Sequence, residues 1–143
     1  MPPSAAATTW IPAFDACLES NDLDGAMQCL DAMKTGHAGT APQAVKDAAI
    51  RRLQHTYETD NVRVREVGLV LAASENPTAK EIGISLLSRV YDTAPVAIDQ
   101  RFLSTGDDPN WEVREWAASA LAHVISWHFE LALPRLREWA MYP

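Results

Sequence analysis

The sequence predicts an all-α fold, and three observations support that prediction. Apolar residues recur at steps of three and four along most of the 143-residue chain, which is the period of an amphipathic helix. Runs of β-branched residues with period-two alternation, the pattern of a half-buried strand, do not occur. Residues that cap or break helices interrupt the apolar stripes at short intervals, so the pattern indicates about eight short helices.

The chain is expected to form one domain. Residues 1–8 are rich in Pro, Ala and Thr and are predicted to be a flexible tail. Residues 9–143 are then a single domain, a common size for one hydrophobic core. Its helices are expected over about 10–20, 23–34, 40–57, 61–72, 77–90, 95–104, 108–128 and 130–141.

Several of these helices begin at residues that suit a helix start. Thr40 and Gln43 resemble a capping box, with Thr as N-cap and Gln three residues on. Asp108 is the expected N-cap of the longest helix, and Pro109 suits its first position, where no backbone donor is needed. The other predicted caps are Asp60 or Asn61, and Asn76.

Each helix carries one apolar stripe that is expected to face the core. The stripes include Val64, Val67, Gly68, Leu71 and Ala72; Ile82, Gly83, Leu86, Leu87 and Val90; Ile98, Phe102 and Leu103; and Val113, Trp116, Ala117, Ala120, Leu121 and Val124.

A short motif recurs along the chain. Residues 64–68 and 113–117 share the pattern Val-Arg-Glu-apolar-small, 49 positions apart, and residues 79–83 carry a weaker version. The small residue allows a neighbouring helix to approach closely. Recurrence at this spacing predicts an α-α superhelix, a solenoid of about four antiparallel helix pairs.

The segment Asp107–Leu121 resembles the consensus of HEAT repeats, which belong to the armadillo-like group of folds. Its pattern is Asp-Asp-Pro-x-x-x-Val-Arg-Glu-x-Ala-Ala-x-x-Leu. In that family the Asp and Arg form a hydrogen-bonded ladder between repeats, which implies a structural joint at Asp60, Asp108 and Arg114. Together with Leu133–Trp139, the segment is similar to the HEAT-like repeats of the AlkD/AlkC group of DNA alkylation repair proteins. The specific likeness covers residues 75–139.

This resemblance implies a concave channel for duplex DNA and removal of alkylated bases. Trp111 and Arg114 match the family's Trp-x-x-Arg helix start. Glu115 follows where the DNA-binding members tend to place a second Arg, and no Trp-Asp-x-x-x-Asp segment supplies the family's catalytic carboxylate. The resemblance therefore implies the family's fold, and it does not by itself imply the family's glycosylase activity.

The net charge of the chain also disfavours DNA binding. The formal net charge is −7, from 12 Lys and Arg against 19 Asp and Glu, and this disfavours DNA, because phosphate binding normally needs a concentrated basic surface. The most basic stretch, Lys46, Arg51, Arg52, His55, Arg63 and Arg65, is interleaved with acids and is interpreted as a solvated helix face.

Other features limit the chemistry. Cys17 and Cys29 show no metal spacing and are expected to be buried apolar residues in a reducing compartment. The four histidines are dispersed, so no metal ligand set, cofactor or catalytic residue is assigned. A cytoplasmic location is expected, since neither a signal peptide nor an apolar run of about 20 residues is found.

The favoured hypothesis is a non-catalytic HEAT-like binding or scaffold module for a protein partner. Its concave face would be built from the second helix of each pair, with Arg65, Trp111 and Arg114 as candidate binding residues. The alternative is an AlkD-like DNA-binding protein or glycosylase acting on alkylated bases, so enzymatic activity is left open. The apolar C-terminal end, residues 139–143, also suggests a homo-oligomer or a partner that covers it.

Overall fold

The computed structural model describes residues 9–34 and 38–141, and this part of the chain is all-helical. The predicted tail, residues 1–8, lies outside the described residues, as do residues 35–37 and the last two residues of the predicted apolar C-terminal end. The helices are α2 (Ile11–Glu19), α3 (Leu23–Asp31), α4 (Gln43–Thr56), α5 (Asn61–Ala72), α6 (Pro77–Arg89), η1 (Tyr91–Thr93, a 3₁₀ turn), α7 (Pro95–Gly106), α8 (Trp111–Trp127) and α9 (Phe129–Ala140).

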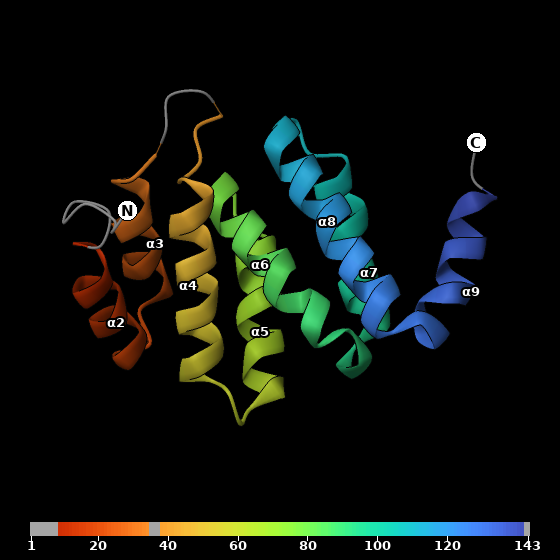
Figure 1. Ribbon diagram of the computed structural model, residues 1–143, viewed down its shortest axis with the longest axis horizontal. Coiled ribbons are helices and arrows are strands. Elements are labelled where there is room, and N and C mark those ends of the chain that lie inside the picture. Colours follow the sequence, from red (N-terminus) through yellow and green to blue (C-terminus); the bar gives the residue numbers. More distant parts are fainter. Residues whose placement is uncertain (1–8, 35–37, 142–143) are drawn as a thin grey trace.

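The helices form a row across the molecule, in which α5 overlaps α6 and α7 overlaps α8 in the view of Figure 1, and the members of each of these pairs pack against each other. Helices α2 and α3 lie at one end of the row and α9 lies at the other. Helix α6 is central, because it packs against α4, α5 and α8. Three helices that are not consecutive in sequence, α4, α6 and α8, thus form one continuous layer.

The close contact between α5 and α6 depends on two glycines. A Cβ atom on Gly83 would lie 2.4 Å from the backbone nitrogen of Ala72, and one on Gly68 would lie 2.8 Å from the Leu87 side chain. Both distances are too short for any larger residue to fit without a shift. The small residues of the recurring motif therefore let neighbouring helices approach closely, as the sequence predicts.

Most of the predicted core stripe is buried. The stripe residues of α5 and α6 are all buried, as are Val113, Ala117, Ala120 and Val124 of α8. Leu103 is a correction, because 55% of it is exposed. In α7 the buried positions are Ile98, Asp99, Phe102 and Thr105, so Leu103 lies just beside the face that packs on the core.

Two predicted caps are confirmed and two are wrong. Asp60 accepts the backbone N–H of Arg63, and Asn76 accepts those of Thr78 and Ala79. The longest helix is capped by Asn110, whose side chain accepts the N–H of Glu112, and not by Asp108. Likewise α4 begins after Pro42, and Thr40 lies outside it.

Helix α9 touches the rest of the protein along a narrow strip. Its one fully buried residue is Ala132, and Leu136 packs partly against the core. Arg135 forms an ion pair with Asp99 of α7 at 2.8 Å, and Asp99 also accepts a hydrogen bond from Tyr91 at 2.6 Å. Much of the remaining apolar surface at this end is exposed.

Candidate functional site

A buried ionic cluster joins α4, α6 and α8. The side chains of Lys46 and Glu81 are completely buried, and the Lys46 ammonium lies 3.0 Å from Glu81 Oε1. The same ammonium contacts Glu112, whose side chain is 20% exposed. Thr40 donates its hydroxyl to Glu112 at 2.9 Å. One cation is therefore shared by two carboxylates from two other helices.

The position of Lys46 differs from the one that the sequence predicts. It belongs to the basic stretch that was interpreted as a solvated helix face, yet it has no exposed surface. It lies three and seven residues before Ala49 and Leu53, which places it on the buried stripe of α4. Arg51 and His55 of the same stretch are exposed as expected, and Arg52 pairs with Asp15 of α2.

The two carboxylates differ in protonation. Burial raises the pKa of Glu81 to about 7, against the opposing effect of Lys46, and Glu112 raises it further. For Glu112 burial also disfavours the ionised form, but hydrogen bonds from Lys46 and Thr40 outweigh it and lower the pKa. Glu81 Oε2 is buried and has no hydrogen-bond partner within the described residues. Glu81 is thus the group of the cluster that exchanges a proton near neutral pH.

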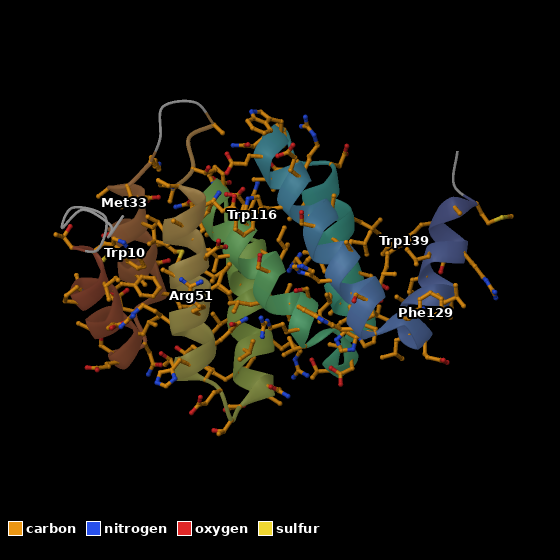
Figure 2. All side chains as sticks on the ribbon, viewed as in Figure 1. Trp10, Met33, Arg51, Trp116, Phe129 and Trp139 are labelled. Carbon is orange, nitrogen blue, oxygen red and sulfur yellow. The ribbon has the colours of Figure 1, made fainter. Side chains whose placement is uncertain are left out.

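Trp116 of α8 connects this cluster to the surface. The Lys46 ammonium lies 4.5 Å from the centre of a Trp116 ring, a cation–π contact. Trp116 is half-buried, and its other side lines a groove of about 570 Å³. In Figure 2, Trp116 lies between α6 and α8, and Arg51 lies on α4. The tryptophan therefore separates the buried ions from the open groove.

The groove runs over α4, α6 and α8 and has two ends of opposite charge. Helices α6 and α8 run in the same direction, because their first turns both meet the start of α4 and their last turns meet at Arg89 and Trp127. Asp47 and Glu115 line the end near the helix starts. The end near the helix C-termini is lined by Arg51, Gln54, Arg89, His123 and Trp127.

Aromatic and cationic groups stack at this basic end. The rings of His123 and Trp127 are stacked with centroids 4.8 Å apart, and the Arg89 guanidinium lies 5.4 Å from the centre of the Trp127 ring. Trp127 is 49% exposed. The Nε2 atom of Gln54 is buried without a hydrogen-bond partner within the described residues. The groove thus presents planar surfaces and hydrogen-bond donors together.

The predicted binding residues do not line this groove. Arg65 of α5 donates to the backbone oxygen of Thr93 at 3.3 Å. Arg114 donates to the backbone oxygens of Asp108 and Pro109 at 2.7 and 3.2 Å. Trp111, in the first turn of α8, is 44% exposed. Their role in binding stays a prediction, while both arginines hold a loop in place.

The predicted structural joint at Asp108 is made by a different partner. The Asp108 carboxylate forms an ion pair with Lys80 of α6 and accepts the N–H of Asn110 at 2.9 Å. Burial opposes the ionised form, but these contacts outweigh it and lower the pKa of Asp108. Arg114 binds the backbone oxygen of Asp108 and not its carboxylate. The link between neighbouring helices therefore uses Lys80.

Sequence reasoning missed Lys46, Glu81 and Glu112 as a group. One signal was present in α6, where Thr78, Glu81, Ser85 and Ser88 recur at helical spacing and form a polar stripe beside the apolar one. Three of these four are buried. A polar stripe on a helix flanked by apolar positions on both sides indicates contact with other helices, because solvent needs only one polar face.

Residues 9–34 and 38–141 contain no group of three His, Cys, Asp or Glu residues that could hold a metal ion. No described helix is long and apolar enough to cross a membrane. Cys17 and Cys29 are free and half-buried, more exposed than the sequence suggests, and burial and the nearby Cys17 thiol raise the pKa of Cys29.

The comparisons with known proteins identify no relative. No protein-family model, curated protein or solved structure matches the chain.

Proposed function

We propose that the protein is a helical-repeat module of the HEAT-like type that binds a protein partner and has no catalytic role of its own. Its helices would form an α-solenoid of antiparallel pairs, with α4, α6 and α8 as the inner layer. The ion pair between Lys80 and Asp108 supports this view, because it ties successive members of that layer together. The arginines of the two motif copies, Arg65 and Arg114, both donate to loop carbonyls.

The groove over α4, α6 and α8 is the observation that carries the proposal. It offers two tryptophans and charges of both signs, a composition typical of protein interfaces, where aromatic residues and Arg are enriched. The buried cluster beneath it ties the three helices together, so the groove is preorganised. A preorganised surface loses less conformational entropy when a partner binds.

Site-specific photocrosslinking tests this function. A photoreactive residue at Ser119, which lines the groove, should capture a discrete partner in cells, and one at the exposed Gln100 of α7 should not. A second variant, Ser119→Arg, should fill the groove and abolish co-purification of that partner. Equal capture at both positions, or co-purification unchanged by Ser119→Arg, would refute the proposal.

A second candidate function, DNA binding or glycosylase activity of the AlkD type, is supported by two arginines and two tryptophans that share the groove. Asp47 and Glu115 in the same groove, and the net charge of −7, oppose a polyanion. Fluorescence anisotropy with duplex DNA at low ionic strength separates the candidates. Binding that falls steeply with salt and weakens in Trp127→Ala, which changes an exposed tryptophan of the groove, would favour DNA binding, and an unchanged anisotropy would eliminate it.

Self-association through the C-terminal end is a further part of the proposal. Phe129, Leu131 and Met141 are 51%, 45% and 85% exposed. Figure 2 shows Phe129 at the outer end of the row of helices. Sedimentation should then reveal a mass that rises with concentration and a Phe129→Ser variant that stays monomeric. If the wild-type protein has the mass of a monomer at all concentrations, self-association through this end is refuted.

A further inference from the structure

The basic end of the groove carries more positive charge than its neighbours neutralise. Neither Arg51 nor Arg89 has a carboxylate within 4.0 Å among residues 9–34 and 38–141, although Arg52, Arg63 and Arg135 all do. Both arginines are exposed and line the same groove from different helices. Two guanidinium groups with free donors are therefore directed to one region of the surface.

A third donor in the same region lacks a partner. Gln54 Nε2 is buried and makes no hydrogen bond within the described residues, and Gln54 lines the groove one helical turn from Arg51. A buried amide donor without an acceptor is unfavourable, so such donors are rare. An oxyanion in the groove meets the exposed donors of Arg51 and Arg89 directly, and it satisfies Gln54 once that side chain turns outward.

The surrounding charges select the kind of anion. Asp47 lies four residues before Arg51 on the same face of α4, a separation of about 6 Å along the helix. Glu115 lines the same side of the groove. A polyanion laid along the groove would meet both acids. A single carboxylate can bind the arginines in a bidentate manner and remain clear of both acids.

We infer that the Arg51–Arg89 end of the groove binds the carboxylate of an acidic side chain from the partner polypeptide. Trp127 and His123 pack against the aliphatic part of that side chain, and Gln54 adds a hydrogen bond when its side chain turns toward the carboxylate. This inference rests on the proposed binding function and specifies the chemistry that the partner presents. Asp47 and Glu115 at the other end then favour a cationic or neutral residue further along the same segment.

The competing explanation is that both arginines are stabilised by the helix ends alone. They lie in the C-terminal halves of α4 and α6, where the helix dipoles favour a positive charge. That explanation requires no bound anion. The two explanations therefore differ in whether a small carboxylate binds to the groove.

A titration with N-acetyl-glutamate amide, followed by NMR of the Trp127 indole and His123 ring signals, tests the inference. We expect a saturable shift in the millimolar range and no shift with the matched neutral probe, N-acetyl-glutamine amide. Losing hydrogen bonds to a charged group should weaken binding about tenfold in Arg51→Gln or Arg89→Gln. Arg137→Gln, which removes an exposed arginine of α9 outside the groove, is the matched control and should bind as the wild type does.

Three outcomes would overturn the inference. These are no saturable shift, equal weakening in Arg137→Gln, and tighter binding of N-acetyl-O-phosphoserine amide than of the glutamate probe. Circular dichroism of the exposed-site variants verifies that each is folded. Because no partner is present in the titration, its failure with successful crosslinking at Ser119 would reject the carboxylate site and leave the proposed function standing. A saturable shift in the titration together with failed crosslinking at Ser119 would reject the proposed function and the partner polypeptide, and would leave only a carboxylate-binding site.

Discussion

Replacing Glu81 with glutamine should change how the stability of the protein depends on pH. Glutamine keeps the size of the side chain and can still accept a hydrogen bond from Lys46, but it does not ionise. In the wild-type protein the pKa of Glu81 is about 7 in the folded state, against 4.5 as the ordinary value. The folded state therefore retains a proton that the unfolded chain releases at lower pH.

The sign and size of the effect follow from this difference. The stabilising contribution of Glu81 is fully present below about pH 4.5 and is lost as the pH rises through about 7. A shift of about 2.5 pH units corresponds to about 3 kcal/mol in total, of which about 2.5 kcal/mol is lost between about pH 5 and pH 8. The Glu81→Gln variant should gain that amount relative to the wild type over the same interval.

Urea denaturation followed by far-UV circular dichroism, repeated across that pH interval, measures the difference. Carboxylates outside the cluster contribute equally to both proteins and cancel when the two free energies of unfolding are subtracted, whereas the response of Glu112, which is coupled to Glu81, is part of the measured difference. Glu75→Gln, the same replacement at an exposed position after α5 and outside the cluster, is the matched control. If the curves for wild type and Glu81→Gln run parallel, Glu81 is not the titrating group and the account of the cluster is wrong.

Four further variants probe other parts of the structure. Lys46→Met leaves two carboxylates without their shared cation and should lower the free energy of unfolding by about 3–5 kcal/mol. The loss should be larger at high pH than at low pH, and an equal loss at high and low pH would contradict this prediction. Gly83→Ala places a Cβ against the backbone of α5 and should cost about 1–3 kcal/mol in thermal or urea unfolding. Gly106→Ala, with open space around it, should be neutral or stabilising. Asp108→Asn should cost about 1–3 kcal/mol at neutral pH in urea denaturation, and the loss should shrink as the pH falls below about 4, because the lowered pKa of Asp108 contributes stability only when the carboxyl is ionised.

The helices and much of the core could be predicted because both depend on local spacing. Val64, Val67 and Leu71 recur at helical intervals, and a helix that buries one of them buries all three. The caps at Asp60 and Asn76 depend only on the residues that follow them. Local patterns of this kind require no knowledge of the neighbouring helices.

The assignment at Asp108 failed because two residues competed for one role. Asp108 and Asn110 can both cap a helix that follows, and local pattern alone favours Asp before Pro. In the folded protein Lys80, 28 residues earlier in the chain, engages the Asp108 carboxylate, and the helix starts at the later cap, Asn110. The partner of Asp108 is a long-range one, which a local pattern does not contain.

The sequence by itself determined that the chain is all-helical, where most of its helices lie, and which apolar faces they bury. Only the tertiary structure decided that Lys46 meets Glu81 and Glu112, from positions 35 and 66 residues away, beneath a tryptophan. The physical reason is that apolar burial follows from periodicity within one helix. A charge can be buried only where opposite charges from other helices reach it, and that condition is set by packing.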